Sequence, residues 1–352
     1  MAKSKRFVSV HDVIQNWLKT RKPDCSFVGK TRDDYMKWRR AFKTRYRKCI
    51  GPWPKKAPVR LEVLKRENKG DYTREKVIFD TCPGVSVPAY ILIPKDIKKG
   101  ERRPGLLAAH GHGDGKDDIC GITREQGDKE KIALIEQLNY EYAIDAVRQG
   151  YVVIAPDWAP FGERKLPEGW FFVDRDPCNI TDIAWRYFGR PLINQNIWDG
   201  MRAVDVLAAR KDVDPRRIGV IGLSYGGTMS THMLINDPRI KVGVVSGYIS
   251  TVRGDALTDR ANGNTCGAQA VPHLLMHGDI PDMLGLAIPK PVLFEMGEKE
   301  TCFWYSDMKK AYAHLRRIYK AAGCPDRMDK DVHPNDHMWS GEKAWGWLAK
   351  WI

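Results

Sequence analysis

The chain has 352 residues, of which 43% are hydrophobic and 29% are charged, a composition typical of a globular protein long enough to bury a large core. Its 58 basic and 44 acidic residues give a net charge of +14, which we interpret as a well-solvated surface and not as a nucleic-acid interface. No apolar run approaches the roughly 18 residues that a membrane helix needs, and no apolar stretch follows the basic residues 1–6 as it would in a secretory signal.

The eight cysteines are scattered along the chain and form no C-x-x-C pair, which argues against a zinc knuckle or a redox motif. Scattered thiols in a chain of this length are typical of a reducing compartment, so we expect a cytoplasmic protein. The sequence leaves a disulfide between distant cysteines open.

Two helices are predicted at the start of the chain. Ser9-Val10-His11-Asp12 has the pattern of a capping box and begins a short helix with one apolar side. In the strongly basic segment that follows, apolar residues recur at spacings of three and four, which predicts a packing face with the charges opposite. They are Tyr35, Trp38, Phe42, Tyr46 and Cys49. We interpret residues 1–70 as a helical extension packed on the core, and residues 71–352 as the main domain.

The hydrophobic period changes after residue 70. Residues 76–80 and 87–93 predict antiparallel strands joined by a turn at Pro83-Gly84. Short apolar runs then alternate with helical segments, as in strands buried on both faces of a sheet, which predicts an α/β fold with a parallel sheet and crossover helices. These runs are residues 105–109, 151–155, 218–221, 242–245 and 291–296.

Two segments, residues 157–195 and 248–288, are longer than plain connections and are interpreted as inserts. The second is rich in Gly, Asp and His. The first carries eight aromatic residues and is predicted to form a wall or lid over a site. These are Trp158, Phe161, Trp170, Phe171, Phe172, Trp185, Tyr187 and Phe188.

Gly222-Leu223-Ser224-Tyr225-Gly226-Gly227 directly follows the predicted strand 218–221 and precedes a helical run, residues 228–235. A serine between a strand and a helix, flanked by glycines that permit a tight and strained turn, is the pattern of a nucleophile elbow. We therefore predict that Ser224 is a catalytic nucleophile.

His110-Gly111-His112-Gly113 ends the predicted strand 105–109. Acyl transfer needs two N–H donors for the developing oxyanion, and we assign these to the backbone amides of His112 and Tyr225. His110-x-His112-x-Asp114 is also the spacing of binuclear metal hydrolases. Their pattern ends with a further histidine where this chain has Gly115, so we prefer the backbone interpretation and predict no metal.

The general base should lie late in the chain, because in this arrangement the histidine follows the nucleophile and the acid. Of nine histidines, only His333 and His337 lie beyond the last pair of strands. His333 is expected in or beside a last strand, residues 328–332. His337 is expected in a loop before a final helix, and we predict that it is the base.

The acid that orients the histidine should follow the strand 291–296. Gly297-Glu298-Lys299-Glu300 offers two carboxylates there, and Asp307 is a third candidate. We predict Glu300, which lies deepest in the loop. Glu298 and Glu295 are expected to be surface charges.

In these residues the chain resembles bacterial α/β-hydrolases related to acetyl xylan esterases and dienelactone hydrolases, from about Tyr35 to the C-terminus. The pieces that carry the resemblance are Trp38-Arg39-Arg40, His110-Gly111-His112-Gly113, Ala155-Pro156-Asp157, Phe161-Gly162-Glu163, residues 213–220 before the elbow, and residues 283–293 before Gly297-Glu298-Lys299-Glu300. Relatives carry Asp where this chain has Glu300. Some relatives place the acid after the preceding strand, where Asp255 would be the candidate.

The resemblance implies an eight-stranded, mostly parallel sheet and hydrolysis of carbohydrate, aryl or small acyl esters. We therefore expect a carboxylic ester hydrolase that needs no cofactor and uses Ser224, His337 and Glu300. Its partner is expected to be a small-molecule ester and neither nucleic acid nor a membrane; assembly into a homo-oligomer is left open. The alternatives are a peptidase or acyltransferase with the same triad, or a non-catalytic binding domain of the same fold.

Overall fold

The computed structural model describes residues 6–167, 176–257 and 265–352. Its centre is a nine-stranded sheet with the strand order β1-β2-β3-β5-β4-β6-β7-β8-β9. The strands are β1 (Glu62–Asn68), β2 (Tyr72–Cys82), β3 (Val85–Pro94), β4 (Arg103–Ala109), β5 (Val152–Pro156), β6 (Val213–Leu223), β7 (Ile240–Ser246), β8 (Val292–Gly297) and β9 (Met328–His333). The pairs β1–β2, β2–β3 and β3–β5 are antiparallel. The pairs β5–β4, β4–β6, β6–β7, β7–β8 and β8–β9 are parallel.

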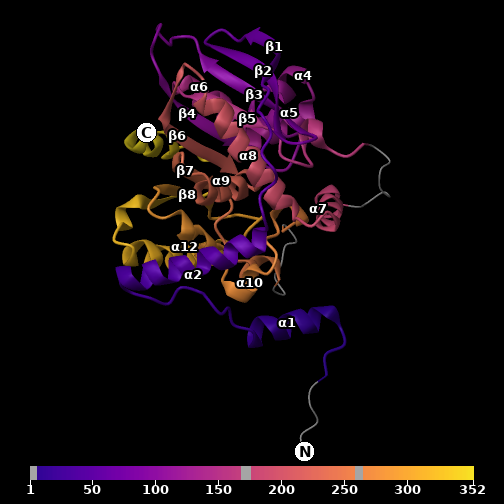
Figure 1. Cartoon of the computed structure of the whole chain (residues 1–352), viewed down its shortest axis with the longest axis vertical. Helices are drawn as coiled ribbons and strands as arrows, with labels where there is room; N and C mark the ends of the chain where they lie inside the picture. The colour runs from indigo at the N-terminus through magenta and orange to yellow at the C-terminus, as the bar shows by residue number, and fades with distance from the viewer. Residues whose placement is uncertain (1–5, 168–175, 258–264) are drawn as a thin grey trace, which may run out of the picture.

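Helices cover both faces of this sheet (Figure 1). They are α1 (Val10–Thr20), α2 (Arg32–Ile50), α3 (Lys116–Ile119), α4 (Ile122–Gln126), α5 (Lys129–Leu138), α6 (Tyr142–Arg148), α7 (Pro177–Tyr187), α8 (Leu192–Ala208), α9 (Tyr225–Asn236), α10 (Leu274–His277), α11 (Ile280–Leu284), α12 (Tyr305–Ala321) and α13 (Ala344–Trp351). In the described ranges, no helix is both long enough and apolar enough to cross a membrane.

Successive side chains of the central strands enter two separate hydrophobic cores. On β4, Leu107 belongs to the core that also contains residues of α2, α8, α9 and α12, whereas Leu106 belongs to the core that contains residues of α6 and α13. Because neighbouring strand residues point to opposite faces, the continuous apolar runs of the sequence correspond to a sheet buried on both sides. The predicted α/β class is confirmed.

The structure corrects two expectations about the sheet and the extension. The sheet has nine strands and not eight, and β1 lies in the segment that was expected to be wholly helical. The expected boundary at residue 70 falls inside the β1–β2 hairpin. Most β1 side chains are exposed and several are charged, which is typical of a protected sheet edge and gives no core pattern in the sequence.

α2 packs its apolar stripe on the core, where the side chains at 35, 38, 42, 46 and 49 are all buried. The helix begins with a capping box between Thr31 and Asp34. The Tyr46 hydroxyl lies 2.8 Å from Nδ1 of His232 on α9. α2 therefore supports the helix that follows Ser224. In contrast, α1 has no buried residue and lies apart from the sheet, at the end of the molecule near the N-terminus (Figure 1).

The two predicted inserts contain short helical elements. Residues 157–195 include the 3-10 turn η1 (Gly162–Arg164), α7 and the start of α8; Trp158 and Phe161 are buried, and Tyr187 and Phe188 are exposed. Trp170, Phe171 and Phe172 lie outside the described residues. Residues 248–288 include the π turn η2 (Val252–Ala256), the 3-10 turns η3 (Gly267–Gln269) and η4 (Gly285–Ala287), α10 and α11. The Gly267 amide donates to Oδ1 of Asn179 at 2.7 Å, so the inserts contact each other.

Candidate active site

Four loops meet at the carboxyl ends of the parallel strands. They follow β4, β6, β8 and β9, and they carry His112, Ser224, Glu300 and His337. Ser224, His112 and His337 line one cavity of about 430 Å³. The other lining residues are Leu138, Tyr140, Asp176, Leu223, Cys266, Gln269, Cys302 and Phe303. In an open parallel sheet, this edge is where ligands bind.

Ser224 stands in a strained turn between β6 and α9. Its φ of 63° and ψ of −120° are rare for a residue with a side chain, and such conformations cost on the order of 1–3 kcal/mol. The turn is held by the Ser224 amide, which donates to the Ser246 carbonyl at 3.0 Å. A Cβ on Gly226 would overlap the carbonyl oxygen of Ala109, at the end of β4. The flanking glycines therefore allow the elbow to pack directly on the neighbouring strand.

The loop after β4 packs against the same serine. A Cβ on Gly111 would overlap the Tyr140 hydroxyl and lie 3.2 Å from Cβ of Ser224. The Gly111 amide donates to the Tyr140 hydroxyl at 2.5 Å, and the Tyr142 hydroxyl donates to the Ala109 carbonyl at 2.6 Å. Two buried tyrosines thus fix the backbone of this loop beside Ser224.

His110 is a fully buried structural residue of this loop. Its Nε2 accepts from the Trp158 amide at 3.0 Å, so the proton is on Nδ1, which donates to the Gly111 carbonyl at 2.7 Å. Burial lowers the pKa of His110 to about 4, which keeps the ring neutral. Because both ring nitrogens are engaged, the geometry does not favour the metal-hydrolase interpretation of His110-x-His112-x-Asp114.

A buried ion pair connects this loop to the end of β5. The Asp157 carboxylate accepts from both the amide and Nζ of Lys116 at 2.8 Å, and from the Glu163 amide at 3.0 Å. The side chains of Lys116 and Asp157 have no exposed area. Nothing in the sequence analysis assigned a role to this pair, although Asp157 belongs to a motif of the resemblance. The pair positions the loop that carries His112.

His337 lies in the loop after β9 and faces Glu300. Its Nδ1 is 2.7 Å from Oε1 of Glu300, which also accepts from the Cys302 amide at 3.0 Å. Burial lowers the pKa of His337, but contacts with Cys302 and Glu300 outweigh this effect and raise it above its ordinary value. Among the described residues, neither buried ring nitrogen of His337 makes a hydrogen bond of standard geometry: Nδ1 is engaged by the ion pair with Glu300, and Nε2 has no partner. This arrangement suits a base whose second nitrogen is open to a substrate or nucleophile.

The other acid candidates have different surroundings. Asp255 is buried, and its Oδ1 accepts from the Trp304 amide at 2.7 Å. Asp307 lies in the first turn of α12 and pairs with Lys310 at 2.8 Å. Glu300 is the acid candidate that forms an ion pair with His337 in the part of the chain that the structure describes.

Glu295 corrects an expectation of the sequence analysis, because it is fully buried on β8 and is not a surface charge. Its carboxylate accepts from the amides of Ser340 at 3.1 Å and Gly341 at 2.9 Å, just after His337. Burial raises the pKa of Glu295 to about 7. Glu298 is exposed, and His333 ends β9. All residues of β8 are buried, so the strand has no alternation of exposed and buried positions that could have indicated the environment of residue 295.

The two predicted oxyanion donors flank Ser224. Tyr225 is the first residue of α9, and the first N–H groups of a helix have no acceptor within it. Its side chain is fixed by Asn196, whose Nδ2 donates to the Tyr225 hydroxyl at 2.7 Å. The ring centroids of His112 and Tyr225 lie 5.6 Å apart. His112 therefore lines the cavity that contains Ser224, and the buried Tyr225 follows Ser224 directly in the chain and contacts the His112 ring.

Comparisons with known proteins agree with this architecture. A family model described as the Abhydrolase family matches residues 2–345. YtaP of Bacillus subtilis (strain 168), assigned as a hydrolase, is 28% identical over 285 residues, which cover 79% of this chain and 87% of YtaP.

Two solved structures share the fold. A Bacteroides fragilis NCTC 9343 protein assigned as an acetyl xylan esterase has a TM-score of 0.74 at 19% identity, over 95% of this chain and 84% of the other. A glucuronoyl esterase from Solibacter usitatus has a TM-score of 0.64 at 16% identity, over 94% and 96% of the two chains. At these identities the likeness shows the fold alone.

Proposed function

Because the chain belongs to the Abhydrolase family, we propose that it is a serine esterase that hydrolyses carboxylic esters without a cofactor. The observation that carries this proposal is the strained conformation of Ser224, which stands beside the cavity that His337 also lines. Strain of this kind persists where the surrounding structure enforces it, and it commonly marks a functional site.

The proposed reaction has two steps. Ser224 Oγ attacks the ester carbonyl and transfers its proton to Nε2 of His337, which then protonates the leaving alcohol. Water, deprotonated by the same histidine, attacks the acyl-enzyme and releases the carboxylic acid and Ser224. The carboxylate of Glu300 holds the imidazole through Nδ1 and stabilises its charged form.

Backbone groups stabilise the tetrahedral oxyanion in this proposal. The donors are the amides of His112 and Tyr225, and α9 directs the positive end of its dipole toward Ser224. The Lys116–Asp157 pair and the tyrosines at 140 and 142 fix the loop that carries His112. Such donors are effective because they are in position before charge develops.

The cavity favours an ester with a small acyl group on a polar alcohol. Its volume of about 430 Å³ is at the lower end of small-molecule sites, which span about 300–1,000 Å³. Leu138, Leu223 and Phe303 offer apolar contacts, whereas Asp176 and Gln269 offer hydrogen bonds to hydroxyl groups. Acetyl xylan esterase and glucuronoyl esterase are the names of proteins that share the fold, so we propose carbohydrate esters as the substrate class.

A panel of p-nitrophenyl, acetylated-sugar, feruloyl and glucuronoyl esters tests this proposal. We expect hydrolysis of short acyl esters, with the highest kcat/KM on an esterified carbohydrate. Ser224→Ala is the matched control on every substrate. Hydrolysis of peptides or transfer of acyl groups, with no ester hydrolysed, would contradict the proposal.

A further inference from the structure

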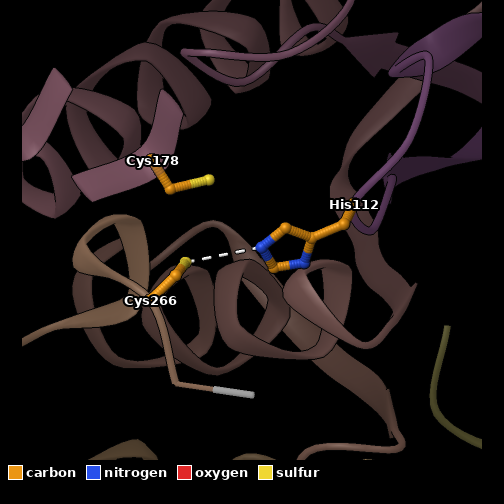
Figure 2. A group of neighbouring side chains, drawn as sticks. All are labelled: His112, Cys178 and Cys266. Carbon is orange, nitrogen blue, oxygen red and sulfur yellow. Dashed lines mark hydrogen bonds between the residues drawn. The ribbon is translucent and has the colours of Figure 1, made fainter. Parts of the chain in front are cut away.

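Three possible metal ligands from separate segments meet beside the catalytic cavity (Figure 2). They are His112 in the loop after β4, Cys178 in the first turn of α7, and Cys266 just before η3. One ligand atom of each residue lies within 4.8 Å of those of the other two. Nε2 of His112 is 3.4 Å from Sγ of Cys266. Figure 2 shows the imidazole and both thiols pointing into the same space.

The distance between His112 and Cys266 is close to one edge of a tetrahedral zinc site, and Cys178 lies within 4.8 Å of both. Zn–S bonds of about 2.3 Å and Zn–N bonds of about 2.0–2.1 Å place neighbouring S and N ligands about 3.6 Å apart, and two S ligands about 3.8 Å apart. The observed distance of 3.4 Å between the His112 nitrogen and the Cys266 sulfur therefore needs only a small adjustment. Thiolate and imidazole ligands together favour Zn²⁺ over the hard ions Mg²⁺ and Ca²⁺.

The surrounding structure holds the two thiol-bearing segments in place. Asp176 caps α7, and its Oδ1 accepts from the Cys178 amide at 2.8 Å. The side chain of Gln269 accepts from the Cys266 amide at 3.3 Å and donates to Oγ1 of Thr228 on α9 at 3.0 Å. Hydrogen bonds of this kind fix the positions of ligands before a metal binds and strengthen the site.

We propose that His112, Cys178 and Cys266 bind one zinc ion per chain at the edge of the catalytic cavity, and that the bound ion inhibits the enzyme. Three protein ligands leave the fourth tetrahedral position for water. His112 and Cys266 line the same cavity as Ser224, so the ion and its water would occupy space that the substrate needs. The inhibition rests on the proposed esterase function, whereas zinc binding does not.

A metal titration tests binding without using activity. Reduced, metal-free protein is titrated with Zn²⁺ against a chromophoric chelator, and with Co²⁺, whose thiolate charge-transfer and tetrahedral bands report the ligands. We expect one ion per chain. Cys178→Ser and Cys266→Ser should each weaken binding by more than about 100-fold, because even outer-shell groups contribute about 10- to 100-fold. Cys25→Ser, on a partly exposed cysteine near α10, should bind as the wild type does.

Glu300, Cys302 and His337 form a second group of possible metal ligands, because their ligand atoms also lie within 4.8 Å of one another. The variant Cys302→Ser tests whether zinc binds to this second group instead. We expect this variant to keep the zinc site. Loss of binding in Cys302→Ser with full binding in Cys178→Ser would overturn the proposal, as would the absence of stoichiometric binding in the wild type.

Ester hydrolysis provides the second measurement. One equivalent of Zn²⁺ should inhibit the wild type and a chelator should restore it, while Cys178→Ser should keep the metal-free activity and resist Zn²⁺. Stoichiometric binding with unchanged hydrolysis would overturn the inhibitory role. If the protein binds zinc but hydrolyses no ester, the result would support the proposed metal site and contradict the proposed esterase function.

Discussion

Oε1 of Glu300 lies 2.7 Å from Nδ1 of His337, although 36 residues separate the two along the chain. The contact follows from the sheet: β8 and β9 are parallel neighbours, and Gly297 pairs with His333 at their carboxyl ends. The loops that leave these two positions therefore begin side by side. A glutamate three residues after β8 reaches the imidazole, where the resemblance suggested an aspartate.

The first prediction concerns this acid. Glu300→Gln should lower kcat by about two to four orders of magnitude in a folded protein, because loss of a triad acid leaves the histidine in the wrong tautomer, at a cost of up to about 10⁴. The matched control is Asp255→Asn, which can still accept from the Trp304 amide and should lose less than about tenfold in kcat. If the two variants exchange these results, Asp255 is the acid.

The second prediction concerns pH. The base must be neutral to accept a proton, so activity should rise as pH increases through the pKa of His337, which the contacts with Cys302 and Glu300 raise. Cys302→Ala removes one of these contacts and keeps the backbone N–H that binds Glu300. The acid limb of kcat/KM against pH should therefore move to lower pH, whereas Cys25→Ala should leave it in place. A shift to higher pH in Cys302→Ala would contradict the assigned environment of His337.

The third prediction concerns the support that α2 gives to the core. Trp38 is 9% exposed, stacks on Phe42 with centroids 5.3 Å apart, and donates through Nε1 to the Cys25 carbonyl at 2.8 Å. Trp38→Ala should lower the free energy of unfolding by about 3–5 kcal/mol, measured by denaturant titration. Met36→Ala, on the exposed face of the same helix, is the control and should change stability by less than about 1 kcal/mol. Equal stability of the two variants would mean that α2 is not a packing helix.

The fourth prediction concerns metal removal. Hydrolysis should survive exhaustive chelation, because every proposed step uses Ser224, His337, Glu300 and backbone amides. Both nitrogens of His110 are already engaged by the Trp158 amide and the Gly111 carbonyl. The measurement is kcat/KM before and after dialysis against a chelator, with total metal content determined in parallel. Loss of activity that zinc or manganese restores would favour a metal hydrolase.

Features set by local spacing could be predicted from the sequence. The glycines around Ser224 are close to it in the chain, and the apolar runs of the central strands are short and continuous. Both the elbow and the α/β class can therefore be recognised from the sequence. β1 could not be recognised because its charged side chains face solvent and its stability comes from backbone pairing with β2.

Side-chain clusters that form only through tertiary packing could not be predicted from the sequence either. Lys116 and Asp157 are ordinary charged residues in the sequence, and only the fold shows that they are buried together. His112, Cys178 and Cys266 belong to three segments that meet only when both inserts pack beside the elbow. Glu295 was expected at the surface because the sequence does not show that the loop after His337 covers the end of β8 with amide donors.

The central claim is that Ser224 is the nucleophile, and active-site labelling with a fluorophosphonate tests it most directly. The probe should modify one residue per chain, located by mass spectrometry at Ser224, and the loss of p-nitrophenyl ester hydrolysis should follow the extent of labelling. Ser224→Ala should be neither labelled nor active, while its unfolding transition stays close to that of the wild type. Full ester hydrolysis by Ser224→Ala, or labelling at another serine, would contradict the account.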